Sequence, residues 1–295
     1  MLCVLPVPSR SQITPWIDIW GDTAQLDNHF ESGFAQGRKP SLLARTTTRM
    51  GIRIPGSHPS TVLMPYLVAT GNYSVDRNNW NNIYATGYGI RIFPFLTMQV
   101  SDSRLAFLPD TRLYWEQLFA NYFKDRDNAK DRDTALANPS RDDRIGVEIW
   151  HEWNERDPAQ PNKPFDKTDS WTELWADISY RETNFTSPPL RNTITSFQLR
   201  RGFYVNAPVG IIEPYGVING VNSGATDFFL NNLQFGMGMR YHPFRYATNV
   251  QGLTALAAKA RIFVEILTIS YTKNRPAAGT PTTDFRFGVE LAIGR

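Results

Sequence analysis

Large apolar residues occupy every second position along several segments of the chain. In the segment 283–293 the apolar positions are Phe285, Phe287, Val289, Leu291 and Ile293. The positions between them carry charged residues, glycine or alanine. A period of two is the signature of a β-strand with two different faces, so the pattern predicts an all-β protein with antiparallel strands.

The same alternation, combined with turn signals, predicts twelve strands along the chain. They are 14–22, 43–54, 61–71, 83–93, 111–124, 143–153, 170–181, 195–205, 208–219, 231–242, 260–272 and 283–293. The connections 55–60 and 206–207 are predicted as tight turns. An even number of strands places both chain termini on the same side of a barrel.

The two halves of the chain carry matching motifs. The pattern G-x-G-x-R-x-x-P-F begins at Gly87 and again at Gly236, 149 positions later. Segments that begin at Arg112 and Arg261 match at the same offset without a gap. We therefore predict two tandem six-stranded repeats, 14–153 and 170–293, joined by a charged, proline-rich connector at 154–169. The alternative is that amphipathic strands resemble one another by chance.

The polar faces of the strands distinguish two all-β architectures. They concentrate glycine together with arginine and glutamate, at matched places in both halves. A soluble sandwich carries lysine, threonine and serine freely on its wet face and few glycines within strands. Small and charged groups together suit the crowded interior of a barrel. We predict one transmembrane β-barrel domain over 1–295, with a soluble β-sandwich or jelly roll as the alternative.

The composition supports a membrane barrel. Aromatic residues make up 13% of the chain, hydrophobic residues only 41%, and the mean hydropathy is −0.37. Transmembrane barrels combine a polar lumen with aromatic girdles at the membrane surfaces. No segment approaches the ~18 uninterrupted apolar residues of a membrane helix, so a membrane span must be made of strands. These features predict a location in a bacterial outer membrane, surrounded by lipid and lipopolysaccharide.

Charge and cysteine content exclude several classes of function. The net charge is +3 and no basic run stands out, so nucleic acid is not a predicted partner. Cys3 is the only cysteine, which excludes an intramolecular disulfide. The first ten residues lack the charged and apolar regions of a signal peptide, so we expect the chain to begin downstream of its true start.

Ten charged residues on the polar faces form the candidate functional site, as residues that line the lumen. One interpretation is structural ion pairing that fills a narrow barrel, and the other is a lining that selects anions or sugars. The ten are Arg91, Arg112, Glu116, Arg144, Glu148, Arg240, Arg261, Glu265, Arg286 and Glu290.

The sequence predicts no catalytic site, metal site or cofactor. His151 and Glu152 lack the second histidine of a zinc-protease helix, and no G-x-S-x-G hydrolase motif occurs. The acidic run 124–133 could bind Ca²⁺, but its interleaved lysines and arginines indicate a solvated loop. An outer-membrane lipid-modifying enzyme is kept as a lesser alternative.

Two resemblances connect the motifs to known families. Gly288, Leu291 and Ile293 fit the last-strand signal recognised by the barrel-assembly machinery, although Gly294 and Arg295 follow where an aromatic terminus is usual. The G-x-G-x-R-x-x-P-F strands resemble the C-terminal barrel of bacteriophage adsorption protein A (NfrA-type) and of exopolysaccharide-secretion proteins. Those relatives carry a periplasmic helical-repeat region ahead of the barrel, and none is visible in this sequence.

We predict a non-enzymatic outer-membrane barrel that serves as a pore or as an export or assembly component, and the resemblance to the secretion barrels implies that it handles polysaccharide. The resemblance also implies contact with a periplasmic or cell-surface protein complex. The alternative from another class is a plugged barrel that serves as a structural anchor or receptor, whose loops bind a partner.

Overall fold

The structure is a computed structural model, and the residues it describes are almost entirely strands with short connections. They are 13–26, 41–55, 62–74, 82–96, 98–122, 140–154, 169–183, 190–208, 210–224, 231–243, 259–273 and 282–293. Most of the predicted connector 154–169, the acidic run 124–133, and Gly294 and Arg295 lie outside these residues.

Twelve long strands and one two-residue strand form a single antiparallel sheet. The long strands are β1 (Thr14–Leu26), β2 (Ser41–Pro55), β3 (Val62–Ser74), β4 (Ile83–Phe93), β5 (Thr111–Tyr122), β6 (Ser140–Asn154), β7 (Ser170–Thr183), β8 (Leu190–Phe203), β10 (Ile211–Ser223), β11 (Asn232–His242), β12 (Ala260–Tyr271) and β13 (Thr283–Ile293). The short strand is β9 (Val205–Asn206), which pairs with the beginning of β10.

The sheet closes on itself. The first strand, β1, pairs with the last, β13, from Ile19 opposite Ile293 to Leu26 opposite Arg286. Every other long strand pairs with its neighbours in the chain, including β10 with β8 and β11. Closure leaves no long strand with a free edge, which confirms the predicted twelve-stranded antiparallel barrel.

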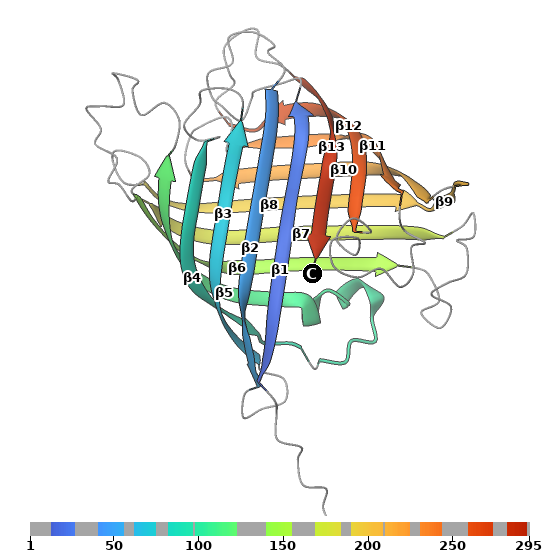
Figure 1. The fold of residues 1–295 in the computed structure, drawn as a ribbon. Coiled ribbons are helices and arrows are strands. Elements are labelled where there is room, and N and C mark those ends of the chain that lie inside the picture. The colour runs from blue at the N-terminus through green and yellow to red at the C-terminus, as the bar shows by residue number, and fades with distance from the viewer. Residues whose placement is uncertain are drawn as a thin grey trace, which may run out of the picture.

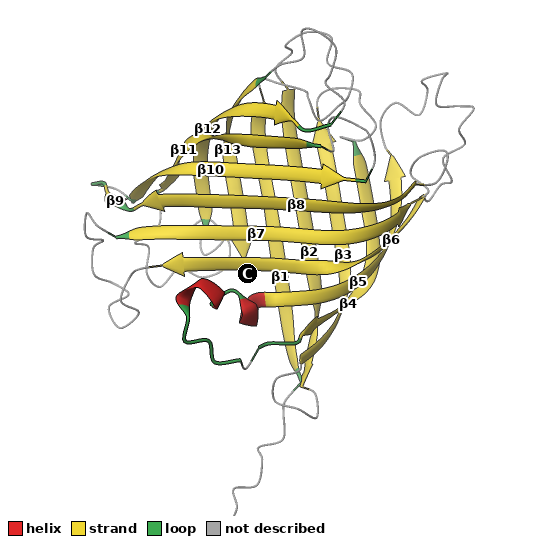
Figure 2. Cartoon of the chain, turned by 180° about the vertical axis from the view of Figure 1, so that it is seen from behind, coloured by secondary structure: helices red, strands yellow, loops and turns green. Residues whose placement is uncertain are grey.

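The strands are strongly inclined to one another across the barrel. Figure 1 shows β1, β2 and β3 crossing in front of β6, β7 and β8 at a steep angle, and Figure 2 shows the same crossing from behind. Strands of a closed barrel must tilt relative to its axis, and opposite walls then tilt in opposite directions in projection. β1 begins and β13 ends on the same side, as the even strand number predicts.

The outer face of the barrel is apolar. Each long strand exposes at least one large apolar side chain, and the most exposed are Met237 at 69% and Leu67 at 62%. The others include Ile17, Met50, Tyr88, Trp115, Ile145, Ile178, Leu199, Ile218, Ile266 and Phe287. Charged residues at the alternate positions are buried, which reverses the arrangement of a soluble protein.

One prediction of local structure needs correction, and one connection contains short helices. The tight turn predicted at 206–207 is a longer connection that holds β9, because Ala207 N–H donates to the Gly210 carbonyl at 3.2 Å and Gly210 has φ 80°. Pro208 has no N–H to extend either strand. Between β4 and β5, two short 3-10 helices, η3 (Ser103–Leu105) and η4 (Leu108–Asp110), lie directly before β5 (Figure 2).

Closure can be tested by a disulfide between β1 and β13. Thr23 and Val289 are direct partners, so Thr23→Cys with Val289→Cys should cross-link on oxidation. Thr23→Cys with Phe285→Cys is the control, because four residues of strand separate the two positions by about 13 Å. Both variants carry Cys3→Ser. Reductant-sensitive mobility of heat-denatured protein on gels is the measurement, and equal cross-linking in both pairs would contradict this register.

Candidate functional site: two charged clusters inside the barrel

The first cluster, termed the β4 cluster, is built around Arg91 in the first half of the barrel. The Arg91 guanidinium lies 2.7 Å from Glu148 and 3.6 Å from Asp18. Arg112 lies 3.5 Å from the same oxygen of Glu148. Arg91 on β4 thus reaches Asp18 on β1 and Glu148 on β6, and neither strand is a neighbour of β4. Arg112 on β5 is the direct partner of Glu148 on the neighbouring strand.

Aromatic rings and a second acidic residue complete the β4 cluster. Glu116 accepts hydrogen bonds from Arg49 at 2.9 Å and from the Tyr66 hydroxyl at 2.8 Å. The Arg91 guanidinium carbon lies 5.8 Å from the centre of the Trp16 ring and 5.2 Å from that of Tyr66. A cation at this distance is attracted by the aromatic face, so the rings help to hold Arg91 in place.

The second cluster, termed the β11 cluster, is built around Arg240. The Arg240 guanidinium lies 3.2 Å from Glu173 and 2.9 Å from Glu290. Arg261 lies 3.5 Å and 3.4 Å from the same two carboxylates.

The β11 cluster contains a further arginine that links three carboxylates. Arg200 lies 3.1 Å from Glu265, 3.3 Å from Glu173 and 3.4 Å from Glu290. The Tyr215 hydroxyl donates to Glu265 at 2.9 Å. Arg200 therefore joins carboxylates that stand on three different strands, β7, β12 and β13.

The two clusters match position by position. Arg91 and Arg240 are 149 positions apart, as are Tyr66 and Tyr215, Glu116 and Glu265, and Arg112 and Arg261. The Trp–Tyr ring centres are 5.7 Å apart in both clusters. In the order of the closed sheet, β4 and β11 are six strands apart among the twelve long ones, so they lie on opposite sides of the barrel.

Burial shows that the interior is filled at the level of the clusters. The side chains of Arg91, Glu116, Arg240 and Glu265 are only 1–2% exposed. A charge removed from water is tolerated only when paired groups replace its hydration. Since arginines and carboxylates alternate in both clusters, the arrangement satisfies the charges internally and leaves little room for solvent beside them.

All ten residues predicted to line the lumen are described, and eight belong to the two clusters. Arg144 and Arg286 instead pair with Asp142 and Asp284 on their own strands, with the arginine Nε 2.6 Å from the carboxylate in each case. Arg144, at 23%, and Arg261, at 22%, have the most exposed side chains of the ten. A role in selecting solutes stays a prediction.

Sequence reasoning missed four members of the clusters. Asp18 and Glu173 occupy matching places in the similar segments that begin at Trp16 and Trp171, so the comparison of the halves could have identified them. Arg49 and Arg200 carry only a weak signal, because each is followed two residues later by a glycine. They lie 151 positions apart, outside the shared offset, on strands whose sequences differ.

Other candidate chemistry is limited. His242 lies 3.0 Å from Glu213 inside the barrel. Within the described ranges, no three or more His, Cys, Asp and Glu side chains gather to hold a metal ion. Among these same residues, no helix is long and apolar enough to cross a membrane.

The predicted assembly signal lies on β13. Gly288 is opposite Ala24 of β1, and a β-carbon at Gly288 would lie 2.1 Å from the Thr23 carbonyl oxygen. Glycine is therefore required where the first and last strands approach each other. Leu291 pairs with Gly21, and Ile293 is the last residue of β13.

Comparisons with known proteins add no family assignment. No family model matches the chain, and no curated protein matches it. Among solved structures, the β-domain of a Bordetella autotransporter has a TM-score of 0.35 at 11% identity, covering 95% of this chain and 98% of that one. An outer membrane channel from Pseudomonas putida F1 has a TM-score of 0.39 at 9% identity, covering 95% of both chains.

A third similar structure is the KdgM porin, with a TM-score of 0.36 at 7% identity, covering 94% of this chain and 99% of that one. Similarities at this level support no conclusion about function, so the function is argued from the residue contacts and burial of this barrel.

The energetic role of the clusters can be tested at Arg240. Replacing Arg240 by alanine leaves Glu173 and Glu290 buried with too little positive charge, so we expect a loss of about 3–5 kcal/mol in the free energy of unfolding. Arg191, which is 70% exposed and pairs with Glu182, is the control. Arg191→Ala should leave the urea unfolding midpoint in lipid vesicles unchanged. Equal midpoints for both variants would contradict the structural role.

Proposed function

We propose that this chain is an integral barrel of a bacterial outer membrane that acts as an export or assembly component, with a lumen closed to ions in this conformation. The observation that carries the proposal is the inverted burial pattern. Every long strand presents large apolar side chains on the outer face, and the charged residues of the two clusters are paired inside. An apolar outer face is stable against the hydrocarbon of a membrane, and closure of the sheet satisfies the backbone hydrogen bonds without water.

The surroundings follow from this location. Lipid and lipopolysaccharide would contact the apolar outer face, and the barrel-assembly machinery would recognise β13 through Gly288, Leu291 and Ile293. A periplasmic or cell-surface protein complex would contact the barrel at its ends. We also propose that the protein is non-enzymatic.

An open pore for polysaccharide is the second candidate. It is supported by the resemblance of the G-x-G-x-R-x-x-P-F strands to exopolysaccharide-secretion barrels. It is also supported by arginines that keep partial contact with solvent, such as Arg45 at 31% and Arg181 at 26% side-chain exposure. The fuller burial of the two cluster centres favours the closed lumen.

We also propose that the barrel arose by duplication of a six-stranded unit. The matched contacts of the two clusters support this origin, as do the paired amide contacts in each half. Asn82 Oδ1 accepts from Ser74 N at 3.2 Å, and Asn231 Oδ1 accepts from Ser223 N at 3.0 Å. Both pairs stand at the offset of 149 found in the sequence.

Single-channel recording tests the closed lumen. The wild-type protein in planar bilayers should show no steady conductance, because paired side chains fill the interior. Arg200→Ser with Glu265→Ser removes both charges of one pair and much of their volume, and should produce measurable conductance. The exposed pair, as Arg191→Ser with Glu182→Ser, is the control. A steady open conductance of the wild type would contradict the closed lumen and would support the open pore.

Membrane integration has its own test. Full-length protein should partition into detergent and should migrate faster on gels when unheated, since a closed barrel resists unfolding by detergent. Recovery of a monomer in buffer without detergent would contradict the outer-membrane proposal.

A further inference from the structure

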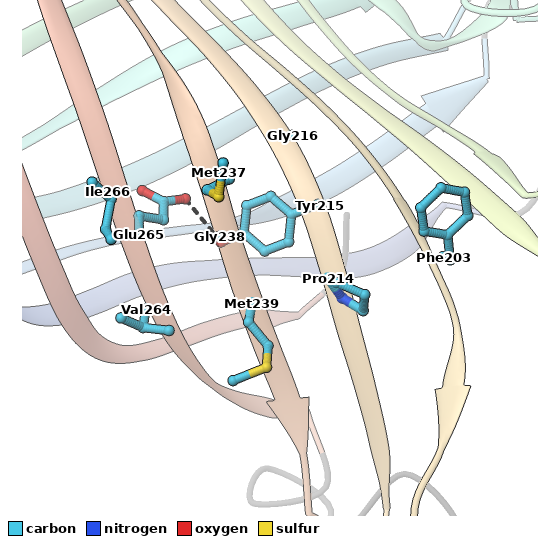
Figure 3. A pocket seen from close by; sticks show the side chains of 10 residues that line it. All are labelled: Phe203, Pro214, Tyr215, Gly216, Met237, Gly238, Met239, Val264, Glu265 and Ile266. Carbon is cyan, nitrogen blue, oxygen red and sulfur yellow. Dashed lines mark hydrogen bonds between the residues drawn. The ribbon is translucent and has the colours of Figure 1, made fainter.

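An apolar groove of about 410 Å³ lies on the outer face of the second half of the barrel. Figure 3 shows its lining side chains on β8, β10, β11 and β12. The lining residues are Phe203, Pro214, Gly216, Met237, Gly238, Met239, Val264 and Ile266, together with Tyr215 and Glu265, whose side chains bond to each other in the β11 cluster. The volume falls within the ~300–1,000 Å³ typical of ligand sites.

The groove exists because a side chain is missing at Gly216. Gly216 pairs with Met237 of β11, whose side chain is 69% exposed. A β-carbon added at Gly216 would meet nothing closer than the Gly236 carbonyl oxygen, 4.0 Å away. Packing therefore does not require glycine here, unlike at Gly236, where a β-carbon would lie 1.9 Å from a carbonyl oxygen. The outer surface therefore has room for a side chain at Gly216 that the sequence does not fill.

A cation stands directly beside the groove. Arg201 is the partner of Gly216 on β8, is exposed, and lies two residues before the end of that strand at Phe203. An exposed arginine is costly in hydrocarbon but favourable near the headgroups, where its long side chain reaches polar groups. The strand end at Phe203 is on the same side of the barrel as the beginning of β1.

The first half of the barrel provides an internal comparison. There the equivalent row is Met50 opposite Leu67, and Leu67 opposite Tyr88. In the second half, Arg201 takes the place of Met50 and Gly216 takes the place of Leu67. The inner clusters match in the two halves, so the outer face has changed where the interior has not. Met50 and Leu67 cover the wall in the first half, whereas the second half has the charged Arg201 and the open space beside Gly216.

We infer that the groove binds one phospholipid of the surrounding bilayer, with an acyl chain in the groove and the phosphate against Arg201. This inference rests on the proposed membrane location. The apolar walls match an acyl chain, and burial of its methylenes supplies the driving force. The guanidinium matches the phosphate in charge and geometry. The site would hold a lipid of the leaflet on the side of the chain termini.

Native mass spectrometry of the full chain in detergent, titrated with dioleoyl phosphatidylglycerol, tests the inference. The wild type should retain one lipid. Gly216→Leu, which restores the residue of the first half, should weaken retention about tenfold by filling the groove. Arg201→Met should weaken it about fivefold and abolish the preference for this lipid over dioleoylglycerol, which lacks the phosphate.

Leu67→Gly in the first half is the matched control, because it opens a gap without a neighbouring cation and should leave retention unchanged. Equal binding by wild type and Gly216→Leu would overturn the inference. So would a dimer that persists without lipid and is lost in Gly216→Leu, since a second copy would then occupy the groove. Detergent partition of the same samples separates the outcomes: failure to partition removes the membrane proposal, whereas a detergent-soluble barrel without bound lipid removes only this site.

Discussion

Closure of the sheet between β1 and β13 is the constraint on which the other features depend. Once the first and last strands pair, each side chain has a fixed face, because a shift of one residue in register would exchange inside and outside along a whole strand. Gly288 makes this seam possible, since any β-carbon there would collide with the carbonyl of Thr23. Closure also satisfies the backbone groups of all twelve long strands, which lets the outer face be apolar.

A closed barrel with polar residues on its inner face must neutralise them in a confined space. The β4 and β11 clusters do this in the same way, with a central arginine held by two carboxylates and two aromatic rings. Removing one partner leaves a buried charge, whereas removing both mainly opens space. Under the proposed function, the same interactions that hold the walls together would also decide whether the lumen can conduct.

The two halves differ most on the outside. Inside, a change at Arg91 or Arg240 would disturb several partners on distant strands, so the matched residues are constrained together. On the outer face, Gly216 and Arg201 stand where Leu67 and Met50 stand in the other half. The outer surface can thus acquire a specific feature in one half while the barrel keeps its architecture.

The alternation of apolar and polar residues by itself determined the twelve strands, their faces and the ten charged residues of the polar faces, because period and register are local properties of a strand. Alternation does not determine where strands end, as the β8–β10 connection shows, because Gly210 and Pro208 act through local backbone geometry. Only the tertiary structure decided which charges meet. Arg200 and Glu290 are 90 positions apart in the sequence and stand on strands that are not neighbours, so no local pattern could pair them. The close packing of the cluster side chains is likewise decided across the closed barrel, because it depends on how far opposite walls approach each other. The outer groove depends on which residues neighbouring strands place beside Gly216.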